Sequence, residues 1–376
     1  MRKVAVVFGG KSCENEISVL TGVFVLNLID KTKFTPIPLY IHTDGGMYTS
    51  PKMTDVGVFR DKKYAQFSRV FLDGGVLYAF GNGKKIKRLC KIDAGINCCH
   101  GGLGEGGGVS AIMEFNAIPF ASPDITASSV FMDKCTTKMI MRALNVPTVD
   151  YIRANESDYK KRGKFLLKSI QSRLKYPVVV KPAHLGSSIG ISVAKTEEEA
   201  KTAIENAFLI DDRVLIEKYL EDKKDINCAV YSLNGEIFVS EPETAFLDGF
   251  YSFEDKYIHR TSDGRIGDLS AKGGGRYEVK GEIRDKIRSY SKTVYKRMNM
   301  RGVVRMDFLV SEGKAYLCEV NTVPGSLAYY LFCERISDAR TFFSDLIEDA
   351  VKEFALKDKK ILSTGILSEV KESYRK

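Results

Sequence analysis

Apolar and polar positions follow two alternating periods in the first third of the chain. Short apolar runs at Lys3–Phe8, Thr35–Ile41 and Ala94–Cys99 are bounded by glycine or polar residues, which predicts buried strands. The segments Glu16–Leu28 and Ser110–Asn116 between them carry helical patterns. Strands that alternate with helices are typical of βαβ units around a parallel sheet. We therefore expect an N-terminal domain built on a small parallel sheet.

Residues 46–91 interrupt this alternation. Their apolar runs are short and are broken by Asp73-Gly74-Gly75 and by Gly81-Asn82-Gly83. An Asn-Gly pair between apolar runs is a strong hairpin signal. We expect this segment to be irregular apart from a hairpin at the second glycine cluster.

The rest of the chain combines short strands with helices. Ser122-Pro123-Asp124 predicts a helix from near Thr126, and a second is expected near Met132. Further patterns predict strands at Tyr176–Lys181 and Val214–Leu220, a helix at Glu197–Ala207, a hairpin of Ile226–Ser232 and Glu236–Glu241 around Asn234-Gly235, and a long helix at Asp338–Leu356.

Two later strands carry polar residues at every second position. In Gly302–Val310 the side chains of Arg305 and Asp307 share one face, and Glu319 and Asn321 share a face of the next strand. A three-residue loop at Glu312–Lys314 would place Asp307 opposite Glu319, whereas a two-residue loop would place them on opposite faces. Converging carboxylate and amide oxygens suit Mg²⁺ with a polyphosphate. The alternative is an ordinary solvated hairpin face.

A second polar feature lies at the end of an apolar strand. Lys181 ends the run from Tyr176, and a loop with Gly186, Ser187, Ser188 and Gly190 follows it. Glycine-containing loops let backbone N–H groups approach phosphate oxygens closely. The lysine precedes the glycines, so this is not a Walker loop. These residues predict a phosphate site of another kind.

Composition bounds the class of protein. The 376 residues are enough for two or three domains, which we place at 1–120, 121–217 and 218–376. No run of eighteen apolar residues occurs and the chain starts with a strand pattern, so we expect a cytoplasmic protein without a membrane partner. Eight cysteines lack C-x-x-C spacing. The net charge of +9 comes largely from dispersed lysines, so we expect no nucleic-acid partner.

The order of these features resembles the ATP-grasp superfamily, in which an α/β fold of three lobes binds ATP. Within it the chain is similar to the D-alanine–D-alanine ligase family, from about Val4 to about Leu331. The motifs that carry this resemblance are Gly9-Gly10-Lys-Ser12-Cys-Glu14-Asn-Glu16-Ile-Ser18, His100-Gly-Gly-Leu-Gly-Glu105-Gly, Met132-Asp133-Lys134 and Asn321-Thr-Val-Pro324-Gly325. The resemblance implies a homodimer that makes a D-alanyl-D-alanine-type dipeptide for peptidoglycan synthesis, with ATP and amino acids as its small-molecule partners.

The resemblance also implies roles for individual residues. Asp307, Glu319 and Asn321 would hold Mg²⁺ or Mn²⁺, as two ions. ATP would meet a set of residues spread over both later lobes: Lys134, Lys181, Ser188, Glu217, Lys218, Leu220, Asp225, Lys256 and Leu309. From the residues themselves, Glu217 and the main chain after it are expected at an adenine edge and Asp225 at a ribose hydroxyl.

The amino-acid side of the site follows from the same resemblance. Glu14 would bind the ammonium of the first amino acid, within reach of Ser187 and Tyr257. Arg305 and the Gly325 N–H would neutralise charge on the phosphate and on the tetrahedral oxyanion. His100, Ser326 and Leu327 would bind substrate. The alternative for Glu14 is a carboxylate that only stabilises the first turn of a helix.

Three departures from the family pattern fall on the amino-acid side. Gly104-Glu105-Gly106-Gly107 lacks an Asp, the segment after Tyr257 lacks the usual lid signature, and Ser326-Leu327 follows Gly325 at once. D-serine, D-lactate or an L-amino acid therefore stays open as the second substrate, and a non-catalytic nucleotide-binding regulator is the alternative from another class. His42, His184 and His259 have no partner at metal-ligand spacing, so no site role is expected for them.

Overall fold

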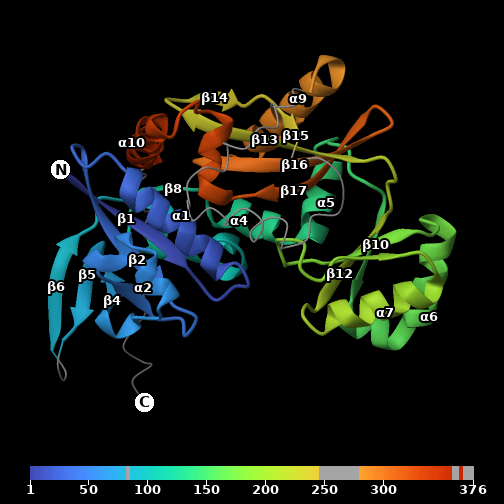
Figure 1. The fold of residues 1–376 in the computed structure, drawn as a ribbon, viewed down its shortest axis with the longest axis horizontal. Helices are drawn as coiled ribbons and strands as arrows, with labels where there is room; N and C mark the ends of the chain where they lie inside the picture. The colour runs from blue at the N-terminus through green and yellow to red at the C-terminus, as the bar shows by residue number, and fades with distance from the viewer. Residues whose placement is uncertain (82–84, 245–278, 358–363, 367–376) are drawn as a thin grey trace.

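Three sheets lie side by side in the computed structural model, which describes residues 1–81, 85–244, 279–357 and 364–366 (Figure 1). Eight strands form the N-terminal sheet, four form the central sheet and five form the C-terminal sheet. In Figure 1 the C-terminal sheet lies between the other two, and helices cover the sheets. The expected three-lobed α/β fold is confirmed.

The N-terminal sheet has a parallel half built as the sequence predicts. Its strands run in the order β2-β1-β7-β8, and helices α1 and α3 connect them. Both faces of β1 are buried: Val4, Val6 and Phe8 face one apolar core, and Ala5 and Val7 face another. The bounds are β1 Arg2–Gly9, α1 Asn15–Leu28, β2 Phe34–Ile41, β7 Ala94–Asn97, α3 Val109–Phe115 and β8 Phe120–Ala121.

The prediction that residues 46–91 are irregular is wrong. They form four antiparallel strands that extend the sheet from β2, so it is mixed and larger than expected. These strands are short, and β6 is exposed at most positions, which is why their hydrophobic pattern is weak. Phe80 pairs with Ile86 across the predicted hairpin, whose residues 82–84 lie outside the described part of the chain. The elements are β3 Met47–Thr49, η1 Pro51–Thr54, α2 Gly57–Arg60, η2 Tyr64–Gln66, β4 Ser68–Asp73, β5 Val76–Phe80 and β6 Ile86–Lys91.

The central lobe is an antiparallel sheet with two helices on one face. The strand order is β11-β10-β12-β9, and α6 and α7 pack against it through a shared apolar core that includes Ile170, Val180 and Ile204 (Figure 1). The predicted strands at Lys181 and Glu217 and the helix from Glu197 are confirmed. The bounds are β9 Tyr151–Asn155, α6 Glu156–Arg173, β10 Val178–Pro182, β11 Ser192–Ala194, α7 Glu197–Phe208 and β12 Arg213–Lys218.

The C-terminal sheet has the order β14-β13-β16-β17, with β15 also paired to β13. The predicted hairpin is confirmed, since Asn234 and Gly235 have φ of 53° and 83° and connect β13 to β14. The bounds are β13 Lys224–Leu233, β14 Glu236–Val239, β15 Glu243–Thr244, α9 Gly281–Arg297, β16 Val303–Ser311, β17 Lys314–Asn321, η4 Gly325–Leu331, η5 Ile336–Asp338 and α10 Ala339–Lys357.

Packing crosses the lobe boundaries drawn from the sequence. Helices α4 (Ile125–Met132) and α5 (Lys134–Ala143) share an apolar core with the C-terminal sheet, through Phe131, Met141 and Phe308. Helix α10 packs on the N-terminal domain, where Phe343 joins the core that contains Val6. The exact lobe limits therefore stay a prediction, and the N-terminal and C-terminal sheets share an apolar core that the sequence boundaries divide.

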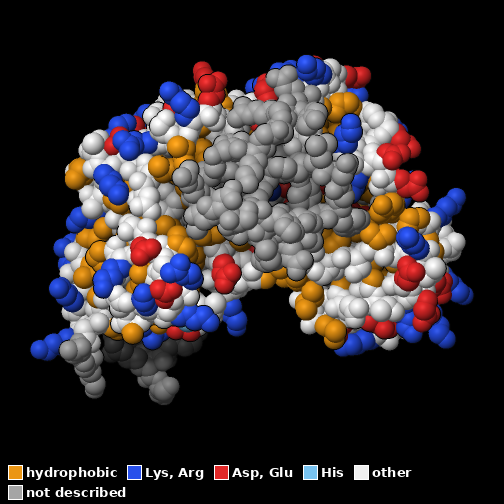
Figure 2. All heavy atoms as spheres, viewed as in Figure 1, with side chains coloured by type: hydrophobic (Ala, Val, Ile, Leu, Met, Phe, Trp, Pro, Cys, Tyr) orange, Lys and Arg blue, Asp and Glu red, His pale blue; other side chains and the backbone are white. Residues whose placement is uncertain are grey.

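Charged side chains are dispersed on the outer surface. On the face drawn in Figure 2, lysine and arginine lie interspersed with aspartate and glutamate and do not merge into one stripe. None of the helices in the described residues has the length and apolar character needed to cross a bilayer.

Candidate active site between the three sheets

The hairpin of β16 and β17 brings two carboxylates together by an unexpected route. Its loop has two residues, Glu312 and Gly313, with φ of 50° and 70°. Such a loop alone would leave the carboxylates on opposite faces. A β-bulge at Cys318 shifts the register, so Asp307 pairs with Glu319. Of the two loop lengths left open, the shorter is present, and the bulge produces the convergence that this loop alone would not.

Arg305 holds Asp307 with two parallel hydrogen bonds. Its Nε donates to Asp307 Oδ1 at 2.8 Å and its Nη2 donates to Oδ2 at 2.9 Å. Asn321, which pairs with Arg305 across the strands, donates to the same Oδ2 at 3.0 Å. Burial opposes the charge on Arg305, but Asp307 outweighs it and raises the Arg305 pKa. Oxygen ligands and a fixed positive charge therefore share one face of the hairpin.

A buried cluster of two lysines and one carboxylate faces this hairpin. Glu217, 2% exposed, forms ion pairs with Lys138 on α5 and with Lys181 on β10. Lys181 Nζ also lies 3.6 Å from Cys318 Sγ, next to the bulge. Burial opposes ionisation of Glu217, yet Lys138 and Lys181 together lower its pKa to about 2. The cluster carries one net positive charge.

The cluster changes the expectation for Glu217 and adds a residue that the sequence analysis missed. Both carboxylate oxygens of Glu217 are engaged by lysines, so an adenine at this strand end would meet main-chain groups. Lys138 was missed because it lies in the middle of a helix, where a lysine is ordinary. Only the approach of α5 to β12 shows that it is buried.

Lys134 connects the loop of residues 185–190 to the hairpin of β16 and β17. Its Nζ donates to Leu185 O at 2.6 Å and lies 3.9 Å from Glu319 Oε2. The loop then turns through Ser187 and Ser188, which have φ of 52° and 61°. These contacts place the predicted phosphate residues beside the predicted metal ligands.

Glu14 reaches across from the N-terminal domain to the same loop. It occupies the N-cap position of α1, but its side chain makes no capping hydrogen bond. Instead Ser187 Oγ donates to Glu14 Oε1. A Cβ added to Gly186 or Gly101 would lie 2.6 or 2.5 Å from Glu14 Oε2, so a side chain at either position would require the Glu14 carboxylate to move from its present place. Glu14 therefore contacts the loop of the central lobe in addition to its place at the start of α1, and its role in substrate binding stays a prediction.

His100 and Ser326 meet through a threonine. His100 is 5% exposed, and its Nε2 lies 2.8 Å from Thr21 Oγ1. Ser326 N donates to the same Oγ1 at 3.2 Å. Burial lowers the pKa of His100 to about 4, so the imidazole is neutral near pH 7. The side chain of Leu327 is buried in the N-terminal core, so any contact of Leu327 with substrate would be through its main chain.

The remaining predicted nucleotide residues lie at the ends of β12, β13 and β16. Lys218 N donates to Asp150 O at 3.0 Å, and Leu220 follows the strand. Asp225 Oδ2 lies 2.5 Å from Lys223 Nζ, and Asp225 pairs with Leu309 across the strands. Two further predicted residues, Lys256 and Tyr257, lie outside the described residues.

Glu105 is a site residue that the sequence analysis did not single out. It lies in the short π-helical segment η3 (Gly104–Gly108). Its Oε2 accepts from Gly101 N at 2.8 Å, and its Oε1 accepts from Val323 N at 3.2 Å. It thereby ties the His100 loop to the segment between Asn321 and Gly325. The available signal was its place in the same glycine-rich motif as His100.

We expect Glu105→Gln to flatten the pH dependence of stability. Burial raises the pKa of Glu105 from 4.5 to about 7, against the N–H groups of Gly101 and Val323, which lower it. Between pH 4.5 and about 7, Glu105 of the folded protein therefore keeps a proton that the same side chain of the unfolded chain has released. The stabilisation by this proton is fully present below pH 4.5 and is lost as the pH rises through about 7, by at most about 3 kcal/mol.

Urea unfolding of both proteins across this pH range measures the effect. The exposed Glu236→Gln on β14 is the matched control, and its pH dependence should equal that of the unmodified protein. A Glu105→Gln curve parallel to the unmodified one would contradict the raised pKa.

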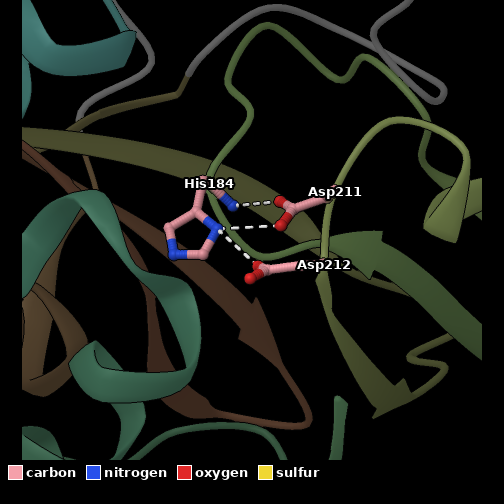
Figure 3. Close-up of side chains that lie close together, drawn as sticks. All are labelled: His184, Asp211 and Asp212. Atoms are coloured by element: carbon pink, nitrogen blue, oxygen red, sulfur yellow. Dashed lines mark hydrogen bonds and ion pairs between the residues drawn. The ribbon is translucent and has the colours of Figure 1, made fainter. Parts of the chain in front are cut away.

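His184 anchors the start of the Gly-Ser loop (Figure 3). Its N and Nδ1 lie 2.7 and 2.8 Å from the two carboxylate oxygens of Asp211, and Nδ1 is 4.0 Å from Asp212 Oδ1. The hydrogen bond to Asp211 raises the pKa of His184 against the effect of burial. No site role was expected for His184, because no partner lies at metal-ligand spacing along the chain; the fold nevertheless brings Asp211, two residues before β12, beside it. Spacing along the chain cannot show this contact.

Comparisons with known proteins cover nearly the whole chain. The family model described as D-ala D-ala ligase N-terminus matches residues 3–123, and the one described as D-ala D-ala ligase C-terminus matches residues 140–352. The D-alanine–D-alanine ligase of Thermosipho africanus is 32% identical over 369 residues, which cover 96% of this chain and 97% of that protein. The ligase of Caldicellulosiruptor bescii is 32% identical, with 93% and 94% covered.

Solved structures agree in fold. The D-alanine–D-alanine ligase from Coxiella burnetii superimposes with a TM-score of 0.76 at 22% identity, over 95% of this chain and 97% of that chain. The VanG D-Ala:D-Ser ligase from Enterococcus faecalis has a TM-score of 0.73 at 24% identity, over 94% and 99%. At these identities the structures show the likeness of the fold.

Proposed function

The chain belongs to the D-alanine–D-alanine ligase family, and from this premise we propose that it joins two D-alanine-type substrates at the expense of ATP, for peptidoglycan synthesis. One observation carries the proposal for this chain. The paired carboxylates of Asp307 and Glu319, the lysines Lys134 and Lys181, and the carboxylate of Glu14 meet where the three lobes come together. A nucleotide-binding regulator would need no such meeting of phosphate residues with an ammonium-binding carboxylate.

The nucleotide half of the proposed site is electrostatically prepared for polyphosphate. The cluster of Lys138, Lys181 and Glu217 keeps one net positive charge, and Lys134 adds another beside the loop. Backbone N–H groups around Ser188 would approach the phosphates. The main chain from Lys218 to Leu220 would meet adenine, with Leu309 beside it and Asp225 at the ribose.

The hairpin suits divalent cations. Asp307, Glu319 and Asn321 offer carboxylate and amide oxygens from adjacent strands, which are the ligands that Mg²⁺ or Mn²⁺ takes in proteins. The donor set therefore fits the two ions that the family resemblance implies. When bound with ATP, such ions would neutralise charge on the β- and γ-phosphates.

Residues of this chain can be assigned to each of the two chemical steps. Glu14 would hold the ammonium of the first amino acid, fixed by Ser187, while that substrate's carboxylate attacks the γ-phosphate to give an acyl phosphate and ADP. The amine of the second substrate then attacks the acyl carbonyl, loses a proton and displaces phosphate. Arg305 and the Gly325 N–H would stabilise the charge that develops on phosphate and carbonyl oxygen. Lys256 and Tyr257 keep the roles that the resemblance implies.

The proposal includes the partners of the protein and its cellular compartment. ATP and small amino acids are its proposed partners, and the cytoplasm is the compartment in which they meet. The homodimer implied by the family stays a prediction, as does the absence of a nucleic-acid partner.

Release of ADP by the purified full-length chain tests the function. We expect ADP only when ATP, Mg²⁺ and D-alanine are all present, with the dipeptide found by mass spectrometry. Omission of the amino acid and its replacement by L-alanine are the controls. ADP release that does not depend on any D-amino acid would overturn the proposal, and nucleotide binding without turnover would favour the regulator.

A further inference from the structure

We propose that Tyr330 selects the second substrate, by the volume of its ring and by its hydroxyl group. The inference rests on the proposed function and deepens it, because it names a residue that decides which small amino acid is accepted as the nucleophile. It depends on the segment η4, in which the pair Ser326-Leu327 follows Gly325 without intervening residues, one of the three departures from the family pattern noted in the sequence.

The backbone of η4 is held in a conformation that few residues adopt. Ser326, Leu327 and Ala328 have φ of 49°, 53° and 48°, in the left-handed region. Three such residues in succession are unfavourable for L-amino acids and persist only where surrounding contacts hold them. Here Thr21 accepts from Ser326 N, and the side chains of Leu327 and Ala328 are 2% and 0% exposed. The N-terminal core thus fixes the path of the chain up to Tyr330.

On this path the side chains of Tyr329 and Tyr330 lie in different surroundings. Tyr329 is 3% exposed and its ring lies 5.1 Å from that of Phe24, centroid to centroid, inside the N-terminal core. Tyr330 is half-buried, and its hydroxyl oxygen lies 3.4 Å from Arg305 Nη1. Both tyrosines follow the predicted substrate residues Ser326 and Leu327 closely enough to border a pocket for the second substrate. Both rings pack on the same core, but Tyr329 is buried inside it, whereas Tyr330 lies at its edge and contacts Arg305 through its hydroxyl.

The contact with Arg305 places Tyr330 next to the chemistry. Nε and Nη2 of Arg305 bind Asp307, and Nη1 points to Tyr330. If Arg305 faces the developing oxyanion, the second amino acid must bring its amine to a carbonyl beside that guanidinium, and so beside the phenol of Tyr330. The ring then limits the side chain of the second substrate to small groups. The hydroxyl favours a substrate that can form a hydrogen bond there over one that cannot.

Two substitutions separate the ring from the hydroxyl. Tyr330→Phe should raise the KM for a second substrate with a polar tip, such as D-serine, roughly tenfold relative to that for D-alanine. Tyr330→Ala should admit bulkier D-amino acids that the unmodified enzyme rejects. In both variants the KM for ATP and for the first D-alanine should stay within about twofold. The readout is ADP release with a panel of second substrates, with products identified by mass spectrometry.

The matched control is Tyr329→Phe, which keeps the ring in the core and should leave the selectivity unchanged. Unfolding curves for all variants identify a loss of folding, and Tyr330→Phe serves if Tyr330→Ala does not fold. An unmodified enzyme that is inactive with every D-amino acid would overturn the proposed function itself. An active enzyme whose Tyr330 variants keep the same ranking of second substrates would overturn only the role of Tyr330.

Discussion

Asp307→Ala is expected to remove ligase turnover while leaving the fold intact. The change deletes one anionic ligand of the proposed metal site and also the partner that holds Arg305 on two hydrogen bonds. Metal ions supply several kcal/mol of charge stabilisation in phosphoryl transfer, so kcat should fall at least about a hundredfold. ADP release at saturating ATP and Mg²⁺ measures the loss, and circular dichroism checks the fold. Glu319→Ala should act in the same way.

Two further variants divide the effect between metal and arginine. Asp307→Asn keeps an oxygen that accepts a hydrogen bond from Arg305 but removes the negative charge, so it should still lose turnover if metal binding is the cause. Glu312→Asn changes an exposed carboxylate in the turn of the same hairpin, where asparagine tolerates the positive φ, and should remain active. Full activity of Asp307→Ala or Glu319→Ala at any Mg²⁺ concentration would contradict the proposal that these carboxylates bind the metal ions.

Glu217→Gln is expected to destabilise the protein by about 3–5 kcal/mol, because it leaves two lysines without their shared counter-charge in a buried place. Lys138 is 0% exposed and Lys181 is 8% exposed. Lys138→Met should cost much less, since one lysine and one carboxylate then remain as a neutral pair. Denaturant unfolding near pH 7, without nucleotide, measures both changes.

A matched ion pair on the surface provides the control for burial. Glu156 pairs with Lys160 one helical turn away, and the lysine side chain is 70% exposed. Glu156→Gln should therefore cost no more than about 0.5 kcal/mol. Equal losses from Glu217→Gln and Glu156→Gln would contradict the argument that the central cluster is desolvated. Addition of ATP should restore part of the stability lost in Lys138→Met, because ligand binding to the folded state stabilises it.

The local sequence pattern was sufficient to predict a strand, hairpin or helix wherever the residues of that element alone carry its signal. The strand of Lys181, the Asn234-Gly235 hairpin and the helix α10 are where periodicity and turn chemistry predict them. The antiparallel strands of residues 46–91 were missed, because short, half-exposed strands leave little hydrophobic pattern and gain their stability from pairing with distant neighbours.

The sequence by itself determined the family, the order of the elements and the residue types that the chemistry needs. These features can be recognised because each motif is defined by its residues and by its position along the chain. Only the tertiary structure decided how those residues meet. The bulge at Cys318 sets Asp307 opposite Glu319, and the approach of α5 buries Lys138 against Glu217. Tyr329 packs on Phe24 inside the N-terminal core, whereas the hydroxyl of Tyr330 lies beside Arg305. Each of these outcomes depends on register or on packing between segments far apart in the chain, and neither is encoded in local spacing.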